Sequence, residues 1–254
     1  PIMIDQEGGR VNRLNEIISL DDLTSEYFGK LFINNKREFK ITYKLFIDNI
    51  SYILKNLGIN INIVPVLDLR YKNSSIVIGD RSFSNNTKIV SEIGDLCIKY
   101  FKNNSIGTVI KHIPGHGLAK VDSHHFTPTI NKSLGYLNKN DFKVFKKKNS
   151  LFAMTAHVIF KKIDSVNTVT HSKKIINFIK NIIKFKNLII TDDLSMRSLK
   201  YSIAENTKKS FIAGCNLALH CNGNLEEMIQ VAENSPKVNS FVLKKTSEFY
   251  NNLG

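Results

Sequence analysis

The sequence predicts an α/β fold built on parallel strands. Short apolar runs alternate along the 254-residue chain with segments of helical periodicity. Most of the runs are too continuously apolar for a half-exposed sheet, which indicates parallel strands covered by helices on both faces. The six predicted strands are Ile2–Asp5, Ile61–Leu67, Gly107–His112, Leu151–Ala156, Asn187–Thr191 and Asn216–His220.

Polar side chains at the ends of these runs favour a (β/α)8 TIM barrel over a doubly wound sheet. In a barrel every strand ends at one face, where reactive groups collect, whereas a doubly wound sheet concentrates its chemistry in one crevice. Only six strands are evident, so two are missing or unrecognised. The strand-end residues are Asp5, Asp68, Lys111, His112, His157, Asp192, Asp193 and His220.

The segments between the runs carry helical stripes of apolar residues. The clearest stripe runs from Phe39 to Leu57 and stops at Gly58, because glycine readily ends a helix. There is no low-complexity linker and no obvious repeat, so we expect a single domain over residues 1–254. Further predicted helices are Ile89–Phe101, Ile175–Ile183, Ser202–Ala213, Leu225–Glu233 and Phe241–Tyr250.

Composition narrows the class of protein. Hydrophobic residues make up 42% of the chain, which is enough for a sizeable core. The net charge of +14 permits a polyanion partner, but the lysines are spread over presumed helix exteriors, which favours solvated faces. Those lysines are Lys143, Lys146, Lys147, Lys148, Lys173, Lys174, Lys180, Lys184 and Lys186.

The remaining composition points to a reduced protein without a membrane span. The three cysteines (Cys97, Cys215 and Cys221) form no CxxC pair, which predicts free thiols in the cytoplasm. No apolar run is long enough to cross a membrane, and no signal peptide is visible. The chain begins at Pro1 without a methionine, so we expect processing or a fragment of a longer chain.

The segment Lys111–Ile130 is the strongest functional lead. It gathers four histidines and Asp122 between glycines and prolines, so it predicts a shaped loop after a strand and makes an enzyme the working hypothesis. Asp122 near His124 is typical of a carboxylate that orients a proton-transferring imidazole, and an Asx-type turn is the alternative. No HExxH or HxH occurs, so neither a metal nor another cofactor is expected.

Two further runs carry candidate chemistry. In ITDDLSM, Asp192 and Asp193 follow a predicted strand, and alternation should turn one of them inward. The inward carboxylate could serve as a nucleophile, a base or a metal ligand, and a helix N-cap pair is the alternative. The run IDQEGGRVNR (Ile4–Arg13) is neither GxGxxG nor a P-loop, so nucleotide binding has no support, and an ordinary βα turn is the simpler interpretation.

Together these runs resemble glycoside hydrolase family 3, and within it the bacterial β-N-acetylglucosaminidases. The resemblance covers almost the whole chain, in the order of the family's motifs. It rests on IDQEGGRVNR, PVLD (Pro65–Asp68), IGDRSF (Ile78–Phe83), KHIPGHG followed by DSH, MTAHVIF (Met154–Phe160), ITDDLSM and AGCNLALHCN (Ala213–Asn222).

The resemblance implies roles residue by residue. Asp192 matches the nucleophile, His124 the general acid/base and Asp122 its partner in a His–Asp dyad. Asp193 and His116 would be structural, and His125 a bystander. The residues matched to binding of the non-reducing N-acetylglucosamine are Asp5, Arg13, Arg81, Lys111 and His112.

The implied activity is that of a retaining exo-β-N-acetylglucosaminidase acting on peptidoglycan fragments in a bacterial cytoplasm, and we expect a monomer without nucleic-acid or membrane partners. A histidine acid/base suits cytosolic pH and brings less negative charge near the nucleophile than a second carboxylate. A phosphorylase, a metal-dependent hydrolase and a catalytically inactive polyanion-binding protein remain as alternatives. The family's barrel has two further βα units before IDQEGG, so the barrel is expected to lack its first two units in this chain.

Overall fold

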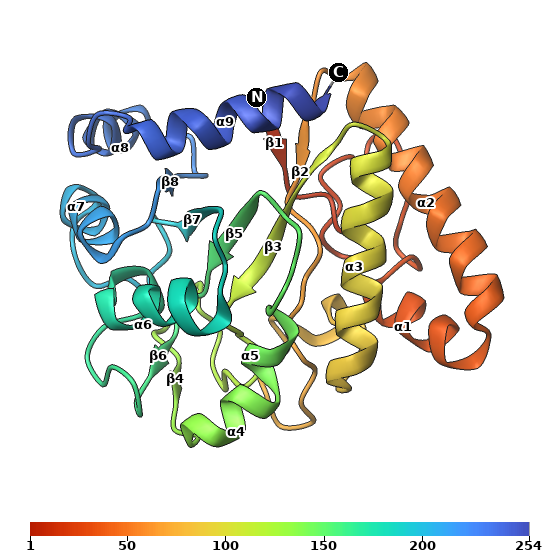
Figure 1. The fold of residues 1–254 in the computed structure, drawn as a ribbon, viewed down its shortest axis with the longest axis horizontal. Helices are drawn as coiled ribbons and strands as arrows, with labels where there is room; N and C mark the ends of the chain where they lie inside the picture. Colours follow the sequence, from red (N-terminus) through yellow and green to blue (C-terminus); the bar gives the residue numbers. More distant parts are fainter. Residues whose placement is uncertain (254) are drawn as a thin grey trace.

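The computed structural model describes residues 1–253, and it shows a curled, six-stranded parallel sheet that forms a half-barrel (Figure 1). The strand order of this sheet is β1-β2-β3-β5-β7-β8, so its strands lie side by side in the order in which they occur along the chain. Strands β4 and β6 pair with each other in a separate two-stranded sheet. The strands are β1 (Met3–Ile4), β2 (Ile61–Asn62), β3 (Gly107–Ile113), β4 (Thr129–Ile130), β5 (Phe152–Thr155), β6 (Ile159–Phe160), β7 (Leu188–Asp193) and β8 (Leu217–Leu219).

Helices cover the outside of the half-barrel, and the last helix, α9, crosses above β1 and β8 in the view of Figure 1. Short 3-10 turns lie at Gly79–Arg81 (η1) and Val169–His171 (η2), and a π-helical turn (η3) spans Ile179–Ile183. The helices are α1 (Ser25–Asn34), α2 (Lys36–Asn56), α3 (Thr87–Asn103), α4 (Leu134–Lys139), α5 (Asp141–Val144), α6 (Lys173–Phe178), α7 (Ile203–Ala213), α8 (Leu225–Glu233) and α9 (Ser240–Leu253).

All six predicted strands are confirmed, although four of them are shorter than predicted. The run Ile61–Leu67 is a strand only at β2, after which a single bridge joins Val66 to Lys111. The six helical stripes are also confirmed, with the π-helical turn η3 continuing α6. Helices α1, α4 and α5 and the β4–β6 pair were not predicted, because each is short or is fixed by contacts with distant segments.

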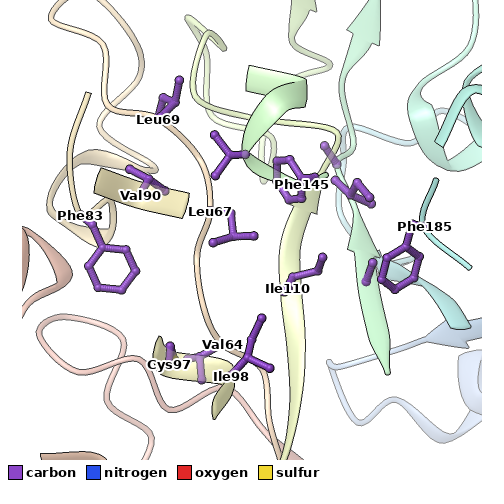
Figure 2. Close-up of a cluster of buried hydrophobic side chains, with 14 of the residues drawn as sticks. Val64, Leu67, Leu69, Phe83, Val90, Cys97, Ile98, Ile110, Phe145 and Phe185 are labelled. Atoms are coloured by element: carbon purple, nitrogen blue, oxygen red, sulfur yellow. The ribbon is translucent and has the colours of Figure 1, made fainter. Parts of the chain in front are cut away.

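Alternation along the strands separates two apolar cores. The outer core lies between the sheet and the helices, and Figure 2 shows part of it, with Val90, Cys97 and Ile98 of α3 near Leu67 and Ile110. The smaller inner core fills the concave side of the sheet and is closed by two side chains of α9. It consists of Ile61, Ile63, Val109, Phe152, Met154, Leu188, Ile190, Val242 and Phe249.

This alternation decides which strand-end residues face the interior. Leu188 and Ile190 belong to the inner core and Ile189 to the outer one, so Asp192 continues the inward-facing series. Lys111 likewise follows the inward-facing Val109. The half-barrel therefore presents these two polar side chains above its own apolar floor.

One expectation about the lysines is wrong. The side chain of Lys148 is 1% exposed, because its Nζ binds Asp95 at 2.9 Å and donates to the carbonyl and hydroxyl oxygens of Ser91 on α3. Its aliphatic stem is buried while its ammonium group is paired, so it fastens the segment after α5 to α3.

No helix among the described residues has the length and apolar character needed to span a membrane.

Candidate active site

A cavity of about 760 Å³ opens at the carboxyl ends of the strands, directly above the inner core. Met3, Ile63, Met154 and Leu219 form its apolar floor. All eight residues that the resemblance singled out line this one cavity, although they are up to 187 positions apart in the chain. They are Asp5, Arg13, Arg81, Lys111, His112, Asp122, His124 and Asp192.

A buried cluster of charges forms one wall of the cavity. Nζ of Lys111 binds Asp5 and also lies 2.5 Å from Oε1 of Glu7. Arg81 grips the same Glu7 carboxylate with two hydrogen bonds of 2.7 and 2.8 Å. Glu7 therefore holds both cations in fixed positions, which is the arrangement that a pre-organised binding wall needs.

The two carboxylates of this cluster respond differently to burial. Burial raises the pKa of Asp5, although Lys111 opposes the shift. Burial acts in the same direction on Glu7, but Lys111 and Arg81 outweigh it and hold the pKa of Glu7 well below its usual range. Glu7 is thus the permanent anion of the cluster, while Asp5, whose side chain is 29% exposed, faces the cavity.

His112 is fixed between two carboxylates. Its Nδ1 lies 2.6 Å from Oδ2 of Asp68, and its Nε2 lies 3.9 Å from Oδ2 of Asp192. Burial opposes ionisation of Asp68, yet His112 and His116 hold the pKa of this fully buried carboxyl below its usual value. The ionised Asp68 orients the imidazole so that its other nitrogen faces Asp192.

Asp192 is an ionised carboxylate on the inner face of β7. Although burial raises its pKa, the neighbouring His112 and His157 and the backbone N–H of Asp193 lower it below the usual value. That N–H donates to Oδ1 of Asp192 at 2.8 Å, which leaves Oδ2 turned toward His112. A fixed carboxylate in this state can attack an electrophilic carbon or accept a proton.

Asp193 does not line the cavity. Its carboxylate accepts hydrogen bonds from the backbone and hydroxyl of Ser195 and from the backbone N–H of Cys221. The second carboxylate of ITDDLSM therefore ties the loops after β7 and β8 together. Asp192 therefore faces the cavity while Asp193 does not, as the alternation along the strand predicts.

Asp122 and His124 form a pair at the cavity mouth. Nδ1 of His124 lies 2.7 Å from Oδ1 of Asp122, and the backbone N–H of His124 donates to the same oxygen at 2.8 Å. Burial opposes ionisation of Asp122, but these hydrogen bonds lower its pKa. The side chain of His124 is 58% exposed and that of Asp122 is 38% exposed, so the imidazole is open to the cavity and to solvent.

Arg13 lines the cavity without a partner for its side chain. Its backbone N–H donates to Gln6, but within the described chain no hydrogen bond or ion pair engages its guanidinium group. Across residues 1–253 no group of three or more His, Cys, Asp or Glu is placed so that it could hold a metal ion. The cysteines are free, with Cys97 and Cys215 buried and Cys221 at the cavity.

Sequence reasoning missed residues that support the site from below. Glu7 was not singled out, although it lies between Asp5 and the Gly-Gly turn of the same motif. Asp68 was noted at a strand end but received no role. Glu7 lies in residues 6–9, which the fold buries throughout, but this stretch is a polar turn in the sequence, so no local pattern indicated its burial.

The chain is similar to known proteins along nearly its whole length. The family model described as "Glycosyl hydrolase family 3 N terminal domain" matches residues 1–245. The "Beta-hexosaminidase" of Neisseria gonorrhoeae is 30% identical over 230 residues, covering 87% of this chain and 62% of that protein. The "Beta-hexosaminidase" of Actinobacillus pleuropneumoniae is 31% identical over 238 residues, covering 91% of this chain and 68% of that protein.

Solved structures agree with this similarity. Native NagZ from Neisseria gonorrhoeae superposes with a TM-score of 0.87 at 27% identity, covering 98% of this chain and 73% of that one. NagZ of the same organism in complex with N-trifluoroacetyl-D-glucosamine gives a TM-score of 0.86 at 26% identity, with the same coverage. The chain thus spans between three fifths and three quarters of these relatives, and it belongs to glycosyl hydrolase family 3.

Proposed function

We propose that this chain is the single catalytic domain of a retaining exo-β-N-acetylglucosaminidase that removes non-reducing terminal N-acetylglucosamine from peptidoglycan fragments. The observation that carries the proposal is the gathering of an ionised Asp192 and the Asp122–His124 pair in one cavity beside a fixed wall of charges. The related NagZ that binds N-trifluoroacetyl-D-glucosamine supports a sugar of this class. The role would lie in recycling of the bacterial cell wall in the cytoplasm.

The first chemical step joins the sugar to Asp192. The carboxylate attacks the anomeric carbon, and the bond from this carbon to the leaving oxygen breaks. His124, as imidazolium, donates its proton to that oxygen, so the leaving group departs as a neutral alcohol. Asp122 stabilises the imidazolium through the 2.7 Å contact with Nδ1.

The second step releases the sugar. His124 is now neutral and takes a proton from a water molecule, whose oxygen attacks the anomeric carbon while the bond to Asp192 breaks. Two successive inversions give net retention of the β configuration. The pair returns to its starting protonation state, so each cycle is balanced without a cofactor.

The charged wall would hold the sugar that reacts. Asp5 accepts hydrogen bonds from hydroxyl groups, and Lys111, Arg81 and Arg13 donate them. His112 sits beside Asp192, and because its Nδ1 donates to the Asp68 carboxylate, its Nε2 accepts a hydrogen bond from a hydroxyl group near the reacting carbon. Glu7 fixes Lys111 and Arg81 in advance, and Asp68 fixes His112, so little conformational entropy is lost at these three groups when the substrate binds.

Hydrolysis of 4-nitrophenyl N-acetyl-β-glucosaminide tests the proposal. We expect turnover by the unaltered chain, none by Asp192→Ala, and a loss of roughly 10²–10⁴-fold for His124→Ala, the usual contribution of a general acid/base. His125→Ala is the matched control, because His125 is an exposed histidine in the same loop and lies outside the cavity lining. Full activity of Asp192→Ala would refute the mechanism.

Inorganic phosphate distinguishes the phosphorylase alternative in the same assay. A hydrolase gives free N-acetylglucosamine at a rate that phosphate does not raise. Rates that climb strongly with phosphate, together with a sugar 1-phosphate product, would select the phosphorylase instead.

A further inference from the structure

We propose that His116 and Ser123 are positioning residues that hold the proton-transfer pair Asp122–His124 over the cavity. Nε2 of His116 and Oγ of Ser123 are joined by a hydrogen bond of 3.0 Å. This inference rests on the proposed function, because it assigns to these two residues a part in the same reaction.

Ser123 is the one buried residue in an otherwise open stretch. It is 3% exposed, although it lies between Asp122 and His124, whose side chains are 38% and 58% exposed. Its neighbours on both sides, Val121 and Phe126 among them, face solvent. A serine that turns inward at this point acts as an anchor for the residues on either side of it.

The hydrogen bonds around this stretch support that role. Its two ends are held by hydrogen bonds, from the N–H of Ser75 to the carbonyl of Ala119, and from the hydroxyl of Thr127 to the carbonyl of Ser198. Between those ends, the described structure contains no hydrogen bond from residues 120–126 to the rest of the protein except the one from Ser123 to His116. The position of Asp122 and His124 over the cavity therefore depends on the hydrogen bond between Ser123 and His116.

His116 is itself buried, and its backbone is bound to a buried carboxylate. It is 2% exposed, and its backbone N–H donates to Oδ1 of Asp68 at 2.6 Å. The glycines on both sides are enclosed: a Cβ added to Gly115 would lie 2.8 Å from Asp141, and one added to Gly117 would lie 2.0 Å from the carbonyl oxygen of Leu69. His116 therefore offers Ser123 a hydrogen-bond partner whose backbone is closely packed. Burial lowers the pKa of His116 to about 4, so its imidazole is neutral at neutral pH.

Asp68 connects His116 to the part of the site around Asp192. Its Oδ1 holds the backbone of His116, and its Oδ2 holds the ring of His112 beside Asp192. One buried carboxylate therefore fixes both the group next to the nucleophile and the anchor of the acid/base loop. Removing the bond at Ser123 should release only the loop.

The test compares Ser123→Ala on two substrates that differ in their need for a proton. A 2,4-dinitrophenyl leaving group departs with little help, whereas the sugar alcohol of N,N′-diacetylchitobiose requires protonation by His124. We expect kcat/KM to fall about tenfold or more on the disaccharide and to stay within about twofold on the aryl substrate. A variant that merely folds less well would lose the same factor in kcat/KM on both substrates.

Two further measurements isolate the positioning role. In the His124→Ala background, Ser123→Ala should cause no further loss, because the group that it positions is gone. Amide hydrogen exchange over residues 120–126 should rise in Ser123→Ala and remain unchanged in α2. His125→Ala is the matched control, since it alters an exposed side chain of the same loop.

Equal losses on both substrates, or unchanged exchange in the loop, would overturn the inference. Absence of turnover by the unaltered chain on either substrate would instead count against the proposed function. In that case hydrogen exchange alone decides whether Ser123 anchors the loop, so the two failures are distinguishable.

Discussion

Replacing Glu7 by glutamine keeps the shape of the side chain and removes the anion that two buried cations share. Glu7 is 2% exposed at its side chain, and it lies 2.5 Å from Lys111 and 2.7 Å from Arg81. In the variant, Lys111 retains the carboxylate of Asp5, while Arg81 retains only neutral acceptors, the carbonyl of Val77 and the amide oxygen of the new side chain. One buried positive charge is therefore left without its carboxylate.

The size of the effect follows from this burial. Breaking a buried ion pair by removing one partner costs about 3–5 kcal/mol, because the other charge stays desolvated. For a chain of this length, that loss corresponds to a fall in Tm of roughly 6–20 °C. The pKa of Glu7 is lowered, so its contribution is present above its ordinary value of 4.5 and is lost as the pH falls toward the lowered pKa.

Calorimetry and urea denaturation at pH 7 measure the loss, and an exposed pair provides the control. Lys36 and Glu92 also approach to 2.5 Å, but their side chains are 49% and 48% exposed. Glu92→Gln should cost roughly 0–1 kcal/mol, since water screens exposed charges. If Glu7→Gln costs no more than Glu92→Gln, the charged wall is not held by a buried anion and the reasoning is wrong.

Two further variants test the surroundings of the site. Burial raises the pKa of Asp141 to about 6, so the folded state holds an extra proton between pH 3.8 and about 6, and stability falls as the pH rises through that range. Asp141→Asn should therefore be more stable than the wild type at pH 7, by up to about 3 kcal/mol, and show no gain at pH 3.5; an equal effect at both values by urea denaturation would exclude this cause. Gly117→Ala should lower Tm and activity, because its Cβ would meet the backbone of Leu69 at 2.0 Å, whereas Gly135→Ala in α4 meets nothing within 4 Å and should leave Tm unchanged or raised. Equal Tm values for the two alanine variants would show that the backbone around Gly117 can shift to accommodate a Cβ, which would contradict the prediction.

The strands and long helices could be predicted because their sequences carry a strong period. The stripe along α2 and the apolar run of β7 each repeat over several residues, and the predicted bounds of α8 agree with the structure. Helix α1 was missed because its apolar face is short and contains Gly29, whose absent side chain admits the backbone of Phe83. This close packing of Gly29 against Phe83 is a long-range contact, which a local sequence pattern cannot predict.

The layer beneath the site was also out of reach of the sequence. The family resemblance selected the residues that line the cavity, because its motifs contain them; of these residues, only Asp5, Lys111, His112 and Asp192 also end a predicted strand. The partners that fix them lie far away along the chain: Glu7 is 74 positions from Arg81, and Asp68 is 44 from His112. The hydrogen bond between His116 and Ser123 depends on how one loop folds back on itself, which no period encodes.

The most direct test of the central claim is to trap the sugar on the protein. A 5-fluoro derivative of N-acetylglucosaminyl fluoride slows the second step, so the glycosyl–enzyme intermediate accumulates and peptide mass spectrometry can locate it. The account predicts one sugar per chain, attached to the peptide that contains Asp192, with no label in Asp192→Ala. A label on Asp193, or turnover with no labelled peptide at all, would contradict it.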